Sequence, residues 1–111
     1  MISFSKYDGI VVKFPFASSL KYKARPAVVI SSDIYNENSR NTSLILAISS
    51  NVKNKLGFEL EIKNWENSGL LKPSIFKASV ATIENDYIVN KLGSLNSEDI
   101  KRLDKYLETI C

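Results

Sequence analysis

The residue best suited to chemistry in this sequence is Arg25, which precedes Pro26 and a run of four apolar residues, 27–30. Proline fixes its own φ angle and has no N–H, so a strand tolerates it at its first residue and not in its interior. It also holds the preceding residue in extended geometry. We therefore expect the guanidinium of Arg25 to sit on a stiff backbone at the mouth of a buried strand, where it would suit an anionic ligand.

A second candidate is the hydroxyl group of Ser49, which ends the apolar run 42–49 and is followed by Ser50. At the end of a buried strand, such a hydroxyl can face the rim and donate a hydrogen bond to an oxyanion. Each candidate has a purely structural alternative. Arg25 could pair with Asp33 or Glu37, and Ser49 could bond to the backbone of its own turn, as serines at strand ends commonly do.

Two lysine-bearing segments flank these candidates, and both have the polar composition of loops. Residues 17–24 carry Lys21 and Lys23 around Tyr22, and residues 50–57 carry Lys53 and Lys55. Lysines neutralise phosphates, and an aromatic ring can stack on a base of a single-stranded nucleic acid. Taken singly, each lysine is more simply a solvated loop residue. Two basic loops beside both candidates favour a shared role in binding a nucleic acid.

Charge and composition set limits on the function. The net charge is +3, and residues 1–60 hold eight Lys and Arg against four Asp and Glu, so the basic excess lies in the half that contains Arg25. The chain has no histidine, which removes the usual acid–base group near neutral pH. A single cysteine, Cys111, excludes a disulfide framework or a thiolate zinc cluster and fits a reducing cytoplasm. No apolar run approaches membrane-spanning length, so we expect a cytoplasmic protein without a membrane span.

The elements that must position these residues follow from the apolar pattern. Alternating or doubly apolar runs predict five strands, at residues 10–16, 25–31, 42–49, 58–62 and 75–82. Residues 33–40 read as a turn with one helical twist, 65–73 as a crossover, and 84–92 as a short helical turn followed by an extended piece that Gly93 ends. A terminal helix begins at Asn96, which can cap it together with Asp99, and one face carries Ile100, Leu103, Tyr106, Leu107 and Ile110.

This order of elements predicts a mainly β, α+β domain that spans residues 1–111. Five short strands followed by one helix are typical of a small, strongly bent antiparallel sheet or partial barrel, with the C-terminal α-helix packed on it.

Several segments, taken in order, resemble one known family. They are Tyr7-Asp-Gly-Ile-Val-Val-Lys-Phe-Pro-Phe16, then Arg25-Pro-Ala-Val-Val-Ile-Ser31, then Leu46-Ala-Ile-Ser-Ser50, Gly69-Leu-Leu-Lys-Pro-Ser74, Ala81-Thr-Ile83 and Lys91-Leu-Gly-Ser-Leu95. This set is similar to the MazF/PemK family of toxin endoribonucleases (mRNA interferases) from type II toxin–antitoxin systems. The resemblance runs from about residue 7 to residue 110.

The resemblance implies an SH3-like barrel, a homodimer, and single-stranded RNA bound in grooves near the dimer interface. It implies cleavage of that RNA without a metal or other cofactor, through attack by the ribose 2′-hydroxyl. The family's catalytic arginine falls on Arg25 and its catalytic Thr/Ser on Ser49. An antitoxin from the same operon is the implied protein partner, in a complex that binds DNA. The candidate RNA-binding residues are Lys21, Tyr22, Lys23, Ser50, Lys53, Lys55 and Lys77.

The chain departs from the family pattern in its fifth predicted strand. Some relatives carry a catalytic arginine and aspartate there, whereas this chain has Lys77 followed by Ala78 and Ser79, and it also lacks the histidine that some relatives use. Two other functions therefore stay open, because fold does not fix function. One is a non-catalytic relative that inhibits a protein target, like the gyrase-poisoning branch of this superfold, and the other is a plain RNA-binding barrel.

Overall fold

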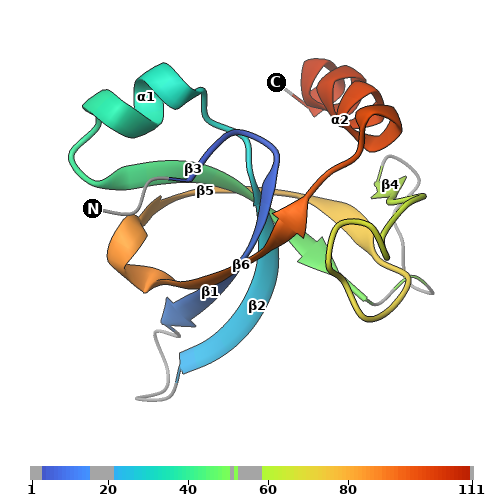
Figure 1. Ribbon diagram of the computed structural model, residues 1–111, viewed down its shortest axis with the longest axis horizontal. Helices are drawn as coiled ribbons and strands as arrows, with labels where there is room; N and C mark the ends of the chain where they lie inside the picture. The colour runs from blue at the N-terminus through green and yellow to red at the C-terminus, as the bar shows by residue number, and fades with distance from the viewer. Residues whose placement is uncertain (1–3, 16–21, 51, 53–58, 111) are drawn as a thin grey trace.

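The computed structural model describes residues 4–15, 22–50, 52 and 59–110. Its six strands form one sheet in the order β4-β5-β3-β2-β1-β6, with every neighbouring pair antiparallel. Figure 1 shows that this sheet is strongly curved, with α1 and α2 on the same side of it. The strands are β1 (Asp8–Pro15), β2 (Tyr22–Val29), β3 (Thr42–Ser49), β4 (Leu60–Glu61), β5 (Ile75–Glu84) and β6 (Ile88–Ser94), and the helices are α1 (Asp33–Asn38) and α2 (Ser97–Ile110).

Both faces of the sheet are buried along residues 27–29 of β2 and at residues 45–46 of β3, as the doubly apolar sequences there predict. Successive side chains of a strand point to opposite faces, so Val28 and Val29 enter different clusters. The first cluster packs against α2 and contains Val28, Leu46, Ile48, Ile62, Phe76, Leu95, Leu103 and Tyr106. The second is formed by residues of β1, β2, β3 and β5, namely Ile10, Val12, Ala27, Val29, Ile45 and Ile83.

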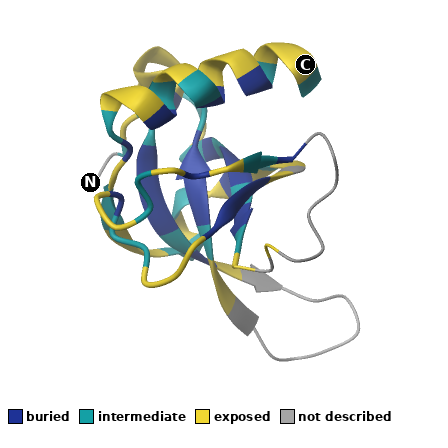
Figure 2. Ribbon diagram, turned by 90° about the vertical axis from the view of Figure 1, so that its right-hand side faces the viewer, coloured by how far each residue is buried: buried dark blue, intermediate teal, exposed yellow. Residues whose placement is uncertain are grey.

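Helix α2 forms as the sequence predicts. Asn96 Oδ1 accepts a hydrogen bond from the backbone N–H of Asp99 at 3.0 Å, which satisfies one of the free amide groups of the first turn. The predicted apolar stripe faces the sheet, where Leu103 and Tyr106 are buried and Ile100, Leu107 and Ile110 are partly buried. Figure 2 shows this division along the helix, with its exposed residues on the side away from the sheet. Neither helix has the length and apolarity needed to span a bilayer.

The structure corrects several sequence-based predictions. The predicted loop 17–24 and the strand beginning at Arg25 are wrong at their boundary, because β2 already begins at Tyr22, where the chain pairs with β1. The predicted fold class, a strongly bent antiparallel sheet with the C-terminal helix packed on it, is confirmed. In detail, the sheet has six strands where about five were expected, and among the described residues it is not closed into a barrel. The sixth, β6, contains Gly93 in its interior, so that glycine does not end an element. Of the strand ends that were predicted, Phe16 and Phe58 lie outside the described residues.

Tyr7 joins the start of β1 to helix α2. Its hydroxyl donates to Asp104 Oδ1 at 2.7 Å, and its carbonyl oxygen accepts from the N–H of Leu95 at 3.1 Å. Its backbone has a φ of 75°, in the left-handed region that non-glycine residues seldom adopt. Burial, together with the hydrogen bond to the Asp104 carboxylate and the repulsion from it, raises the pKa of Tyr7 to about 12.

This shift predicts a loss of stability in alkali. The unfolded chain loses the Tyr7 proton near its ordinary pKa of 10.0, whereas the folded chain keeps it until about 12. The unfolded state therefore binds fewer protons in that window, and the free energy of unfolding falls as pH rises from about 10 to about 12. Urea titrations of wild type and Tyr7→Phe across this window should show a shallower fall for the variant. Parallel falls would contradict the assignment.

Candidate active site

The site begins where the ladder between β2 and β3 ends. These strands pair at Ala27 with Ala47, Val28 with Leu46, and Val29 with Ile45. The next residue of β2 is Pro26, which has no N–H to continue the ladder. Continued in the same register, the pairing would set Pro26 opposite Ile48 and Arg25 opposite Ser49. Pro26 therefore marks the point at which the two strands part.

A cavity of about 270 Å³ lies at this point of separation. Arg25 from β2 and Ser49 from the end of β3 both line it, so the two candidates for chemistry share one solvent-facing site. The opposite boundary comes from the segment after the turn at 63–69 and from β6. The lining residues are Arg25, Pro26, Ile48, Ser49, Ser50, Gly69, Leu70, Leu71, Lys72, Ser74 and Leu92.

The cavity has a cationic lining. Among the residues that the structure describes, the charged residues of the lining are Arg25 and Lys72, and no carboxylate is present. Arg25 is exposed and makes no ion pair within the described part of the chain, so the predicted alternative of a structural pair with Asp33 or Glu37 does not form. Asp33 instead accepts a hydrogen bond from the N–H of Lys6 at 3.1 Å. An unpaired guanidinium with forked donors suits an oxyanion.

The wall that carries Lys72 packs closely against β6. Gly69 has a φ of 84°, and a Cβ placed there would lie 2.3 Å from the carbonyl oxygen of Leu92. At Gly93, a Cβ would lie 2.9 Å from the carbonyl oxygen of Ser68. Only glycine permits this approach of backbone to backbone, and Gly69 also needs the positive φ. The two glycines thus fix the position of the cavity wall relative to the sheet.

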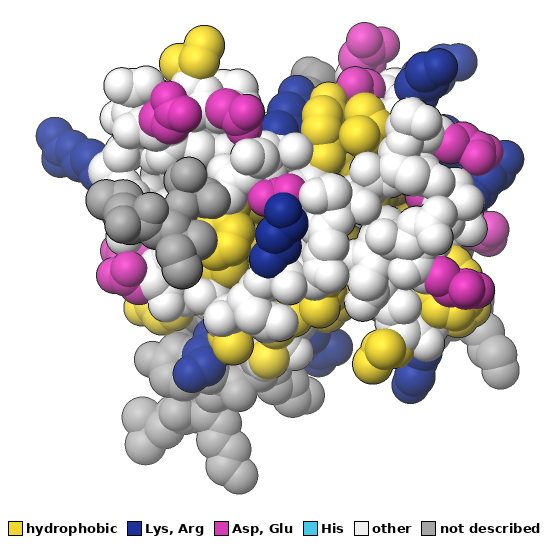
Figure 3. Space-filling model, in the orientation of Figure 1, with side chains coloured by type: hydrophobic (Ala, Val, Ile, Leu, Met, Phe, Trp, Pro, Cys, Tyr) yellow, Lys and Arg dark blue, Asp and Glu magenta, His cyan; other side chains and the backbone are white. Residues whose placement is uncertain are grey.

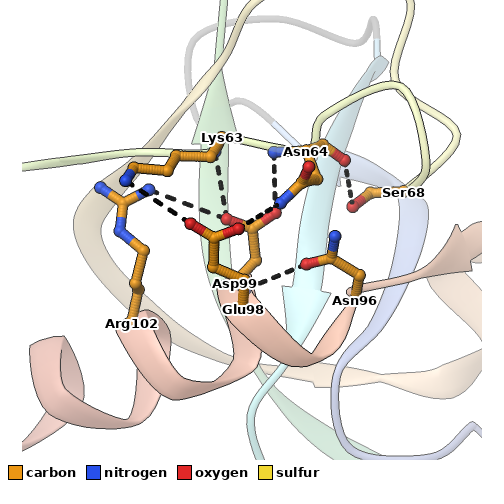
Figure 4. Close-up of polar contacts among 7 residues, drawn as sticks. All are labelled: Lys63, Asn64, Ser68, Asn96, Glu98, Asp99 and Arg102. Atoms are coloured by element: carbon orange, nitrogen blue, oxygen red, sulfur yellow. Dashed lines mark hydrogen bonds and ion pairs between the residues drawn. The ribbon is translucent and has the colours of Figure 1, made fainter.

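The other end of this wall is held by a buried carboxylate on α2. Asp99 is fully buried, and its two oxygens accept from the N–H groups of Lys63 at 3.1 Å and Asn64 at 2.9 Å. Arg102 Nη1 lies 3.8 Å from Asp99 Oδ1, close enough for an ion pair and too far for a hydrogen bond. Figure 4 shows the carboxylate between helix and turn, with Asn96 capping the same helix end. Asp99 therefore anchors the turn that leads into the cavity.

Residues 7–111, nearly the whole chain, match the family model described as a PemK-like, MazF-like toxin of type II toxin–antitoxin systems. The chain belongs to this family. Comparison with curated protein sequences gave no significant match.

Solved structures of mycobacterial toxins share the fold of this MazF/PemK-like chain. One is an endoribonuclease in complex with its cognate antitoxin from a mycobacterial species, with a TM-score of 0.74 and 14% identity over 99% of this chain and 94% of that one. Another is the Mycobacterium tuberculosis toxin MazF-mt6, with a TM-score of 0.69 and 17% identity over 91% of this chain and 94% of that one. At these identities, the likeness establishes the common fold.

The predicted site residues of this family member fall into four groups. Arg25, Ser49 and Ser50 line the cavity together. Lys77 is exposed on β5 and is not among the lining residues; it begins a three-residue bulge, 77–79, opposite Ala47. Tyr22 and Lys23 are described by their backbone alone, as the first two residues of β2. Lys21, Lys53 and Lys55 lie outside the described residues.

Lys72 is the charged lining residue that the sequence analysis did not single out. It was placed in a crossover and given no role, although Lys72-Pro73 repeats the cation–proline order of Arg25-Pro26. In both pairs, the proline restricts the preceding residue to extended geometry. That repetition is the signal that could have identified it. Within the described residues, His, Cys, Asp and Glu side chains form no group of three suited to a metal ion.

The surface around the sheet is mixed in character. Figure 3 shows acidic and basic side chains interspersed over much of the face seen in Figure 1, while basic and hydrophobic side chains lie side by side along its lower edge. The cavity has the same combination, since the cations Arg25 and Lys72 stand beside Pro26, Leu70 and Leu92. A nucleotide, with a charged phosphate and an apolar base face, matches such a lining.

Proposed function

We propose that this MazF/PemK-like toxin is an endoribonuclease that cleaves single-stranded RNA, including mRNA. The observation that carries the proposal is the shared cavity, which Arg25 and Ser49 line together. Within the described ranges, Arg25 makes no ion pair and no carboxylate lines the cavity. Membership of the toxin family and the likeness to endoribonuclease toxins support it.

In the proposed reaction, the ribose 2′-hydroxyl attacks the adjacent phosphorus and the bond from phosphorus to the 5′ oxygen breaks. The products are a 2′,3′-cyclic phosphate and a 5′-hydroxyl, and no metal ion takes part. Negative charge builds on the non-bridging oxygens, where the fixed donors of Arg25 are best placed to stabilise it. The guanidinium of an arginine carries N–H donors and no acceptor, so the role of Arg25 is charge stabilisation and proton donation to the leaving 5′ oxygen. The proton of the 2′-hydroxyl passes to water, and water returns a proton to Arg25. Ser49 donates a hydrogen bond to a phosphate oxygen.

The implied partners belong to the same proposal. One of the solved structures with this fold is bound to its cognate antitoxin, and we propose that an antitoxin likewise neutralises this toxin in the cytoplasm. We also propose that the toxin acts as a homodimer, with RNA lying near the interface. Size-exclusion chromatography with light scattering, at several protein concentrations, tests the dimer.

A cleavage assay in EDTA tests the proposed activity. Labelled single-stranded RNA mixed with the purified toxin should yield fragments that end in 2′,3′-cyclic phosphate, and the same sequence with 2′-O-methyl groups throughout should stay intact. Uncut RNA at a large excess of protein would overturn the proposal. In that case a salt-sensitive gel shift would identify a plain RNA-binding protein, and trapped cleaved plasmid in the presence of gyrase would identify a gyrase poison.

A further inference from the structure

Lys72 stands in the same cavity as Arg25 but reaches it from a different part of the chain. Arg25 comes from β2, whereas Lys72 comes from the segment that follows the turn at 63–69. No Asp or Glu is present among the described residues that line the cavity, so no carboxylate there compensates the two positive charges. Lys72 also makes no ion pair within the described ranges. Two uncompensated cations in so small a space favour an anion between them.

The backbone of Lys72 is held in place before any ligand arrives. Pro73 restricts it to extended geometry, and Ser74 Oγ donates to its carbonyl oxygen at 2.9 Å. The carbonyl oxygen of Ser74 in turn accepts from the N–H of Ile62 at 3.0 Å, which closes the loop at the edge of the sheet. Together with the packing of Gly69 on Leu92, these contacts fix the backbone of Lys72 relative to the sheet.

The remaining lining indicates what accompanies the anion. Pro26, Ile48, Leu70 and Leu92 are apolar, and Leu71 on the same wall is 93% exposed. An apolar surface beside two cations suits a phosphodiester whose base lies against the side chains. Inorganic phosphate would use the cations and leave this surface uncovered.

We propose that Lys72 is a second phosphate-binding residue of the site, which holds a phosphodiester next to the one that is cleaved. This inference rests on the proposed ribonuclease function and adds a subsite to it. An ammonium group on a flexible stem acts as a point charge, without the fixed fork of a guanidinium. Lys72 therefore contributes to RNA binding in the ground state and the transition state alike, and its loss raises KM while leaving kcat nearly unchanged.

Binding of uncleavable 2′-O-methyl RNA across a salt series tests the subsite. For single strands, the slope of log affinity against log salt is about −0.7 for each neutralised phosphate, so Lys72→Ala should reduce its magnitude by about 0.7. With equal affinities at 1 M salt, that change in slope corresponds to about fivefold weaker binding at 0.1 M salt. Lys72→Arg should keep the wild-type slope, because it keeps the charge. Lys101→Ala is the matched control, since Lys101 is an exposed lysine on α2 outside the cavity.

The outcomes separate this inference from the proposed function. Wild type that cleaves unmodified RNA, with Lys72→Ala altered in slope and KM and Lys101→Ala unaltered, supports both. Wild type that cleaves RNA while Lys72→Ala and Lys101→Ala behave alike overturns the subsite alone. Wild type that does not cleave RNA overturns the proposed function, whether or not it binds RNA. Thermal melting of each variant checks that the fold is intact. Lys72→Arg must keep the wild-type salt slope and KM that Lys72→Ala changes.

Discussion

Replacing Arg25 with alanine should lower the rate of RNA cleavage by about 10²–10³-fold while leaving the stability of the protein nearly unchanged. A donor fixed at the point where charge develops contributes about 2.7–4 kcal/mol to lowering the barrier. Arg25 is exposed and unpaired among the described residues, so its removal breaks no folded-state ion pair. Surface substitutions of this kind change the free energy of unfolding by about 0.5 kcal/mol or less.

The measurement is kcat on a fixed RNA substrate, together with the urea midpoint of each variant. Expression in a bacterium should agree with the measured rates: wild type should arrest growth, and Arg25→Ala should relieve the arrest. Arg25→Lys keeps the charge and loses the planar fork, so its rate should fall between the two. Arg40→Ala, an exposed arginine outside the cavity, is the control and should retain full activity. A large drop in stability for Arg25→Ala would indicate a structural role.

The central strands and the last helix could be predicted from the sequence because their signals are local. Strand β3 runs from Thr42 to Ser49, as its apolar sequence indicates, and the cap at Asn96 forms as expected. The start of β2 could not be predicted in this way. Tyr22 to Ala24 are polar or small and read as a loop, yet they pair with Lys13 to Pro15 of β1. Their place in the sheet comes from that partner and not from their own composition.

Part of the site could be predicted, and the rest depends on packing. Arg25 and Ser49 were matched to a family pattern. The pairing of β2 with β3 ends at Pro26, and both residues lie beyond that point, at the same cavity. Their chemical roles are proposals. Asp99 was expected only to share in capping α2. Its carboxylate is instead buried against the amides of Lys63 and Asn64, which are distant in sequence, and no local pattern marks that contact.

This buried carboxylate should carry the largest effect on stability. Asp99→Ala removes the acceptor of two backbone amides and leaves Arg102 beside an empty position. Breaking a buried charged contact by deleting one partner costs about 3–5 kcal/mol. Since a domain of this size is stable by about 5–15 kcal/mol in total, the variant should lie close to the threshold of unfolding.

Urea unfolding of Asp99→Ala, Asp99→Asn and Glu98→Gln measures this effect. Asp99→Asn keeps one carbonyl acceptor and should fall between wild type and the alanine variant. Glu98 lies one residue away and pairs with Lys63 at 3.5 Å, but both side chains are more than half exposed, so Glu98→Gln should change little. Equal midpoints for Asp99→Ala and Glu98→Gln would show that the buried contact contributes nothing.

The turn held by Asp99 leads into the wall that carries Lys72, so the folded fraction of Asp99→Ala should also bind RNA more weakly. Such a result would show that helix α2 acts on the geometry of a cavity that its described residues do not line.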